Sequence, residues 1–344
     1  MIKKNFLKLN LFLVLFFCTK ISLASLQIVG AGSSFIYPIL SLWTKMYKKN
    51  NEIEINYQPI GSGGGLHQIY HGIINFAASD MPLSKKEIQK KLILQFPGII
   101  GGIVLVVNLH GILSNQMVLD GCTISEIYNG KIQYWDNPKI IHLNPDLKIP
   151  HHRIITIHRA DGSGTTFNFT YYLSQINKNW KKNIGYNTTV QWPGIGIGAK
   201  GNAGVSSQIL HIPYSIGYVE YAFAKQNNLT ILKIKNKSGE IVQANKFTFS
   251  NAVKKANWLS GFNTLLINQK GLHIWPIVAV TFILIPKKEN INIIKIILNF
   301  FKWTHTNNAK FMADKLDYIA IPNNIAKLIE KNWDNFLYLK NKKY

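Results

Sequence analysis

The segment Arg159-Ala160-Asp161-Gly162-Ser163-Gly164-Thr165 decides how the rest of the sequence is interpreted. It follows the apolar run 154–157, which is typical of a short buried strand, and it precedes residues 166–173, which are typical of the first turns of a helix. Because a helix start carries unpaired N–H groups and the positive end of the helix dipole, the segment could bind an anion. The alternative is an ordinary capped helix after a glycine turn.

The side chains of this segment also suit an oxyanion. Its two glycines would let a ligand approach the backbone closely, and Ser163 and Thr165 add hydroxyl donors. Arg159 presents a planar set of donors, which Asp161 could orient. We therefore expect these side chains to contribute to an anion site if other parts of the chain meet them.

Two further serine-bearing, glycine-rich segments lie between a predicted strand and a predicted helix. The first is Gly30-Ala31-Gly32-Ser33-Ser34-Phe35, and the second is Ile60-Gly61-Ser62-Gly63-Gly64-Gly65. Each alone is compatible with a simple capped helix or loop. If all the helix starts converge, Ser34 and Ser62 join Arg159 in a dense donor set for a tetrahedral oxyanion.

Asp80 ends a short predicted strand and could be an ordinary turn aspartate. If it instead lies in the anion site, its carboxylate would repel the anion. The repulsion disappears if the anion carries a proton that the carboxylate accepts. Phosphate has such a proton at neutral pH and sulfate does not. A site built to accept a ligand hydrogen bond can reject an analogue without it by roughly 10⁴–10⁵.

The N-terminal residues are typical of a secretory signal. A basic start precedes an apolar run at 11–17 and a small-x-small ending, which predicts cleavage after Ala24. Cys18 raises a lipoprotein alternative, which the bulky Phe17 disfavours. Cleavage would leave Cys122, expected in a turn and interpreted as an incidental thiol, so no intrachain disulfide is expected.

Composition favours a globular α/β protein of two domains. The chain has 344 residues, 47% of them hydrophobic, and strands alternate with helices along it. The net charge of +23 could indicate binding to nucleic acid or an anionic surface. However, arginine occurs only at 153 and 159, and the lysines are scattered, so solvated lysine faces and no nucleic-acid partner are expected.

No pattern of an enzyme is evident. The sequence has no G-x-S-x-G elbow, no histidine beside a candidate serine, and no H-E-x-x-H spacing. Residues 196–201 match G-x-G-x-x-G, but Trp192-Pro193 precedes them where a strand is required, and Gly204 weakens the following helix. We interpret this segment as a mobile or rim loop without a nucleotide. A secreted phosphatase and a basic surface-binding protein remain as rival hypotheses.

Several motifs together resemble those of periplasmic phosphate-binding proteins of phosphate ABC transporters, over nearly all of the mature chain. They are Gly30-Ala31-Gly32-x-Ser34-Phe35, Tyr57-Gln58-x-Ile60-Gly61-Ser62, Ala78-Ser79-Asp80-x-Pro82-Leu83 and the opening segment, with Gln95-Phe96-Pro97, Gly217-Tyr218-Val219-Glu220-Tyr221 and Trp275-Pro276 in support. Gly63, where a second serine is usual, His158 and Cys122 depart from the pattern.

The resemblance implies a two-lobed α/β fold, type II-like, with mixed sheets flanked by helices and joined by crossing strands. Residues 25–104 and 278–344 would form lobe I, and residues 105–277 would form lobe II. The implied function is high-affinity phosphate binding in the periplasm and delivery to the permease and ATPase of an ABC transporter, by a monomer without cofactor, metal or catalysis. The implied phosphate ligands are Ser34, the Phe35 N–H, Ser62, Asp80, Arg159, Ser163, the Gly164 N–H and Thr165, with Asp161 steadying the arginine.

Overall fold

The computed structural model of the chain describes residues 27–51, 53–258 and 262–341. The predicted signal segment and Cys18 lie outside these residues. The strands are β1 (Gln27–Gly32), β2 (Glu54–Gln58), β3 (Phe76–Ser79), β4 (Ile93–Val107), β5 (Val118–Asp120), β6 (Ile155–Arg159), β7 (Gly196–Ala199), β8 (Ser215–Glu220), β9 (Thr230–Ile231), β10 (Lys233–Lys235), β11 (Ile241–Val242), β12 (Leu266–Ile267) and β13 (Ile277–Pro286). The helices are α1 (Tyr37–Asn51), α2 (Ser62–Tyr70), α3 (Lys85–Lys91), α4 (Gly121–Tyr128), α5 (Pro138–Leu143), α6 (Gly164–Ile176), α7 (Lys178–Asn183), α8 (Gly201–His211), α9 (Tyr221–Gln226), α10 (Lys246–Lys254), α11 (Ile291–Trp303), α12 (Asn307–Lys315) and α13 (Asn323–Asn341).

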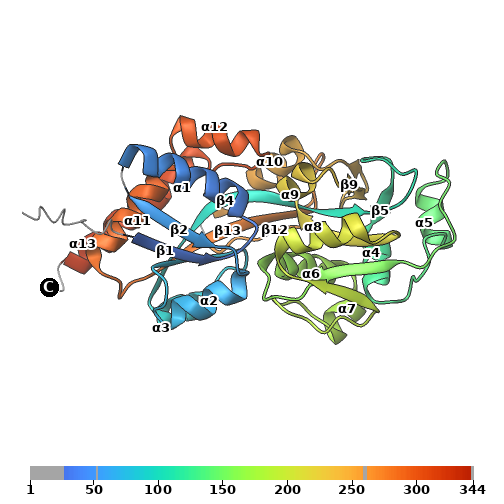
Figure 1. The fold of residues 1–344 in the computed structure, drawn as a ribbon, viewed down its shortest axis with the longest axis horizontal. Helices are drawn as coiled ribbons and strands as arrows, with labels where there is room; N and C mark the ends of the chain where they lie inside the picture. The colour runs from blue at the N-terminus through green and yellow to red at the C-terminus, as the bar shows by residue number, and fades with distance from the viewer. Residues whose placement is uncertain (1–26, 52, 259–261, 342–344) are drawn as a thin grey trace, which may run out of the picture.

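The main sheet is mixed and has the strand order β2-β1-β3-β13-β4-β8-β6-β7. β1 pairs in parallel with β2 and β3, and β6 pairs in parallel with β7 and β8, whereas β13 is antiparallel to β3 and β4. Helices cover both ends of this sheet, and a small sheet, β11-β10-β5, lies beside it (Figure 1). The arrangement places two groups of parallel strands on either side of the long central pair.

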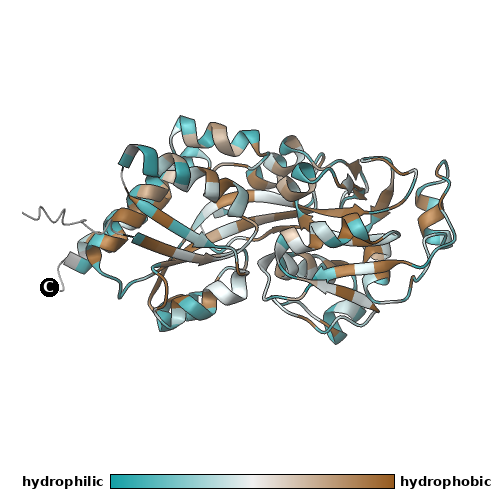
Figure 2. Cartoon of the chain, viewed as in Figure 1, coloured by the Kyte–Doolittle hydropathy of each residue, from teal (hydrophilic) through white to brown (hydrophobic). Residues whose placement is uncertain are grey.

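The long strands β4 and β13 connect the two halves of the molecule. Residues 93–102 of β4 pair with β13, and residues 103–107 pair with β8, so the strand changes partner at Gly102 and Ile103. All fifteen residues of β4 are buried, and Figure 2 shows both long strands to be mostly hydrophobic. A strand buried on both faces has this continuous apolar composition rather than an alternating one.

Two consecutive glycines lie inside β4. Gly101 and Gly102 keep regular pairing with β13, and the register shifts opposite Gly98. A side chain at Gly101 would meet the ring of Phe35, and one at Gly102 would meet the ring of Phe249. These two glycines therefore make room for aromatic rings that pack against the strand.

The expectation of a loop at residues 196–201 is wrong. Residues Gly196–Ala199 form β7, in parallel register with β6, and α8 begins at Gly201 despite Gly204. The glycine-rich run is itself the strand, since a side chain at Gly196 would collide with Thr156 on the neighbouring strand. Cys122 likewise lies in the first turn of α4, not in a turn before it. Within the described part of the chain, no helix is long and apolar enough to cross a bilayer.

Candidate functional site

The starts of α1, α2, α6 and α8 meet at one place between the two groups of parallel strands. Ser62 Oγ accepts hydrogen bonds from the Asp80 N–H (3.2 Å) and from the Gly164 N–H (3.1 Å). The Gly63 N–H donates to the Gly162 carbonyl (2.8 Å). Each of these helices follows the carboxyl end of a strand, which is the edge where ligands of α/β sheets bind.

Asp80 lies just after β3 and is 1% exposed. Its Oδ2 accepts from the Ser33 hydroxyl (2.7 Å), and its Oδ1 accepts from the Thr281 hydroxyl (2.7 Å). Thr281 comes from β13, whose antiparallel pairing with β3 sets Phe282 opposite Ser79. Two hydroxyl donors therefore hold the carboxylate in a fixed orientation.

Burial raises the pKa of Asp80 to about 6, while the Ser33 and Thr281 hydrogen bonds and the Arg159 charge lower it. At pH 7 the carboxylate is thus mostly ionised and accepts hydrogen bonds. An ionised carboxylate has only acceptor sites, so it favours a ligand that brings its own proton.

Arg159 ends β6 and is 4% exposed. Its Nε donates to Asp161 Oδ1 (2.7 Å) and its Nη2 to Asp161 Oδ2 (2.5 Å), which is a bidentate pair, while Nη1 lies 3.4 Å from Thr165 Oγ1. Burial alone would raise the pKa of Asp161, but the bonds and charge of Arg159 outweigh it and lower that pKa. The Gly201 N–H also donates to Asp161 Oδ1 (3.0 Å), which ties α8 to this pair.

The Ser34 hydroxyl is hydrogen-bonded to α8, whose start is not among the three helix starts predicted to form the anion site. Its Oγ accepts from both the backbone N–H and the side-chain Nδ2 of Asn202, each at 3.1 Å. The Asn202 Oδ1 in turn accepts from the Glu220 N–H (3.1 Å). With both acceptor positions of the hydroxyl in use, its proton remains to be donated.

The other predicted ligands also lie in this cluster and have partners of their own. The Phe35 N–H donates to Ser33 Oγ (3.0 Å). Ser163 caps α6, because its Oγ accepts from the Thr166 N–H (3.0 Å). Ser62 and Ser163 are fully buried, and Thr165 is 1% exposed. The structure thus brings the predicted residues of both halves together.

Four residues of the cluster were missed in the sequence: Ser33, Asn168, Asn202 and Thr281. Asn168 Nδ2 donates to the Asp80 carbonyl (2.8 Å) and to the Gly164 carbonyl (2.9 Å), which joins the two halves directly. Ser33 lies in the glycine-rich segment at 30–35 and Asn168 in the predicted helix at 166–173, so their polar side chains were available as a signal. Asn202 directly follows the segment 196–201, for which a loop is expected, and Thr281 lies in an apolar strand without any local signal.

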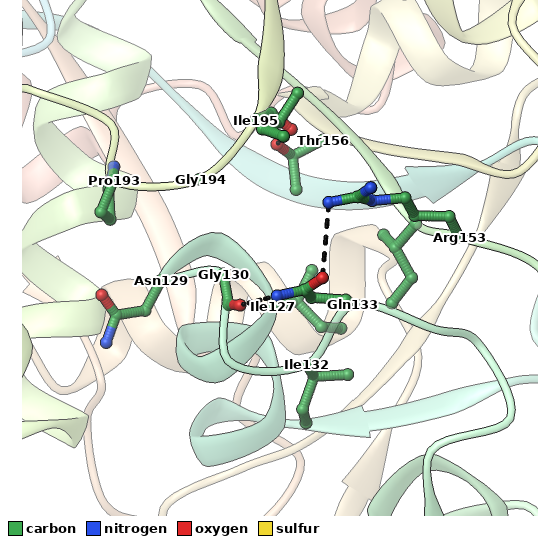
Figure 3. Close-up of a pocket in the computed structure, with 11 residues that line it drawn as sticks. Ile127, Asn129, Gly130, Ile132, Gln133, Arg153, Thr156, Pro193, Gly194 and Ile195 are labelled. Carbon is green, nitrogen blue, oxygen red and sulfur yellow. Dashed lines mark hydrogen bonds between the residues drawn. The ribbon is translucent and has the colours of Figure 1, made fainter.

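A separate cavity of about 180 Å³ lies away from this cluster, between the end of α4 and the chain before β7. Figure 3 shows Arg153 beside Gln133 at its edge, with 3.4 Å between Arg153 Nη2 and Gln133 Oε1. None of its lining residues belongs to the predicted phosphate ligands. Among the described residues no cluster of three or more His, Cys, Asp or Glu side chains could hold a metal ion.

The fold and the sequence match known binding proteins. Residues 21–307 match the PBP superfamily domain. The phosphate-binding protein PstS of Haemophilus influenzae is 44% identical over 310 residues, covering 89% of this chain and 92% of that protein. That of Xylella fastidiosa (strain Temecula1) is 45% identical over 312 residues, covering 90% of this chain and 85% of that protein.

Solved structures show the same fold at low identity. A high-affinity periplasmic phosphate-binding protein (PfluDING) bound with phosphate has a TM-score of 0.70 at 17% identity, covering 89% of this chain and 93% of that one. A phosphate-binding protein from Stenotrophomonas maltophilia has a TM-score of 0.63 at 15% identity, covering 88% and 92%. The predicted two-lobed α/β fold is confirmed. From its match to the superfamily domain and its identity to full-length relatives, this chain belongs to the PstS family of phosphate-binding proteins.

Proposed function

We propose that this chain is a periplasmic receptor that binds inorganic phosphate and passes it to the permease and ATPase of an ABC transporter. The observation that carries the proposal is Asp80, a buried and mostly ionised acceptor at pH 7, in a cluster rich in donors whose other carboxylate, Asp161, is paired with Arg159. Phosphate fits such a cluster because it accepts hydrogen bonds through its oxygens and donates one through its proton. The relatives from Haemophilus influenzae and Xylella fastidiosa are named as phosphate-binding proteins, which supports phosphate as the ligand.

The donors come from helix starts, hydroxyl groups and one guanidinium. Ser34, Ser62 and Thr165 offer hydroxyl protons, and the Arg159 guanidinium offers charge-assisted bonds. The backbone N–H groups of Phe35 and Gly164 and the Ser163 hydroxyl complete the proposed set of phosphate ligands. Since these groups are buried, their bonds to a phosphate oxygen are stronger than they would be in water.

The binding step involves both lobes. We place the lobe boundaries in the crossing strands, at 104/105 and 277/278, near the point where β4 changes partner. Ser34, Ser62 and Asp80 then belong to lobe I, and Arg159, Ser163 and Thr165 belong to lobe II. A ligand that bridges the two sets would favour the closed arrangement of the lobes.

The remaining parts of the proposal concern chemistry and location. We propose that the receptor is a monomer that performs no catalysis, and that a signal segment cleaved after Ala24 sends it to the periplasm. The test is isothermal calorimetry of the purified mature chain with phosphate, followed by incubation with a chromogenic phosphate ester. We expect one phosphate per chain and no ester turnover. Absence of heat, or release of the chromophore, would contradict the proposal.

A further inference from the structure

Glu220 is a second buried carboxyl group close to the site. It ends β8 at the point where β8 meets the crossing strand β4, and it is 1% exposed. Its Oε2 accepts from the Ala222 N–H (2.9 Å) and the Phe223 N–H (3.3 Å), so it caps the short helix α9. Among the described residues, no salt bridge includes this carboxyl group.

The contacts of Tyr318 define where the proton of this group lies. The Tyr318 hydroxyl oxygen is 2.6 Å from the Phe35 carbonyl oxygen and 2.9 Å from Glu220 Oε2. A phenol has one proton to donate, and a carbonyl oxygen can only accept. If Glu220 were ionised, one of these two short contacts would join lone pairs. Both are hydrogen bonds when Glu220 Oε2 carries a proton and donates it to Tyr318, which donates to Phe35.

Glu220 is therefore linked to two proposed phosphate ligands. Its side chain contacts the Tyr318 hydroxyl, which donates to the Phe35 carbonyl, and the rings of Tyr318 and Phe35 pack edge-on with their centroids 6.2 Å apart. Its backbone N–H orients Asn202, which holds Ser34. Ser34 and Phe35 are adjacent at the start of α1, so both routes end at the same turn.

We propose that Glu220 is a positioning residue of the phosphate site, which binds phosphate with a neutral carboxyl group that donates to Tyr318. Loss of the proton turns the phenol away from Phe35 and adds a negative charge beside the site, and both changes weaken anion binding. The inference rests on the proposed phosphate-binding function.

The groups around Glu220 favour its neutral form. Burial and, to a smaller extent, the Asp80 charge raise its pKa, the hydrogen bonds that an ionised Glu220 would accept from Ala222, Phe223 and Tyr318 lower it, and the net pKa is raised to about 8. Tyr221, on the same helix, interacts with Glu220 and with Asp317. The pKa of Tyr318 is raised well above its ordinary value of 10 by burial, by Glu220 and by the Asp80 charge, so this phenol keeps its proton where Glu220 titrates.

The experiment compares phosphate dissociation constants at pH 7.5 and pH 9.5 for the wild type and Glu220→Gln. Glutamine stays neutral at both pH values and therefore removes the titration at this position. We expect the wild-type constant to rise about tenfold or more over this range, and the Glu220→Gln constant to rise less than about threefold. Glu126→Gln, which changes a glutamate of the lobe II surface, is the matched control and should follow the wild type. Phosphate ionisation is common to all three proteins and cancels.

A second variant tests the hydrogen bonds from Glu220 through Tyr318 to Phe35 without changing any charge. Tyr318→Phe removes the donor to Phe35 and should weaken phosphate binding about fivefold or more at pH 7.5, whereas Tyr134→Phe, at an exposed tyrosine, should not. Parallel alkaline profiles for the wild type and Glu220→Gln would overturn the inference, as would unchanged affinity in Tyr318→Phe. If the wild type itself binds no phosphate at pH 7.5, the proposed function fails instead.

Discussion

Asp80 and Glu220 are both 1% exposed, yet they have different surroundings. Two hydroxyl groups donate to Asp80, which also feels the Arg159 charge, and its pKa is raised by burial only to about 6. Glu220 lacks an arginine partner, shares one phenol with a carbonyl group, and has a pKa raised by burial to about 8. Burial pushes both groups towards the neutral form, and the donors decide which of them is charged at pH 7.

This difference assigns the two carboxyl groups different tasks. In the proposed site, an ionised Asp80 accepts a hydrogen bond from the phosphate proton, and a neutral Glu220 donates a hydrogen bond to Tyr318 behind Phe35. The charge of Asp161 is balanced by Arg159, whereas an ionised Glu220 would add an unpaired negative charge near Asp80 and repel the anion.

Removing the cation should have the largest effect. Arg159→Ala deletes the guanidinium and leaves the buried Asp161 carboxylate without its bidentate partner. Removing a buried charged group that hydrogen-bonds its partner costs roughly 2–5 kcal/mol of binding free energy, so we expect phosphate affinity to fall about 100-fold or more. Calorimetric titration measures this. Arg153→Ala changes the only other arginine, which is exposed, and should bind like the wild type. An unaltered dissociation constant for Arg159→Ala would contradict the assigned role.

Neutralising Asp80 should remove discrimination. Asn at this position offers an amide donor, which pairs with a sulfate oxygen as well as with phosphate. We expect the ratio of sulfate to phosphate dissociation constants to fall about 100-fold or more in Asp80→Asn. Asp314→Asn, at an exposed surface pair, should keep the wild-type ratio. Equal ratios for Asp80→Asn and the wild type would show that another group distinguishes phosphate from sulfate.

Acid should reproduce part of that change. The folded-state pKa of Asp80 is raised to about 6, so the group is ionised at pH 7 and mostly protonated at pH 5. We expect the sulfate-to-phosphate ratio of dissociation constants to fall about tenfold between pH 7 and pH 5 in the wild type. Asp80→Asn has no such group and should show a flat ratio. A wild-type ratio that does not change with pH would place the Asp80 pKa below this window.

The smallest effect concerns stability. The folded pKa of Glu220 is raised from 4.5 to about 8, so the folded protein holds this proton more tightly than the unfolded chain. The corresponding stabilisation is fully present below pH 4.5 and is lost as pH rises through 8. Compared with Glu220→Gln, the wild-type Tm should therefore fall by a few degrees between pH 5 and pH 8. A constant difference between the two Tm values would contradict a protonated Glu220.

Local patterns predicted much of this arrangement. Helices begin at Ser62 and at Gly164, in two of the glycine-rich segments that are predicted to precede a helix. The proximity of Ser62, Asp80 and Arg159 was expected from the resemblance to phosphate-binding proteins. Their charge states could not be predicted, because these depend on neighbours far along the chain.

Long-range pairing explains the parts that sequence reasoning missed. Thr281 reaches Asp80 across 201 positions because β13 returns beside β3. Tyr318 reaches Phe35 across 283 positions, and Asn202 reaches Ser34 across 168. The segment at 196–201 was misread because its glycines suggested a loop, whereas they let β7 pack against β6.

Competition between phosphate and sulfate for the wild-type protein at pH 7 tests the central claim most directly. The protein is loaded with labelled phosphate, and unlabelled phosphate or sulfate is added in increasing excess. We predict that an equal concentration of phosphate displaces half of the label, while sulfate needs an excess of about 10³-fold or more. Displacement by the two anions at similar concentrations would contradict the claim that Asp80 selects the ligand by its proton.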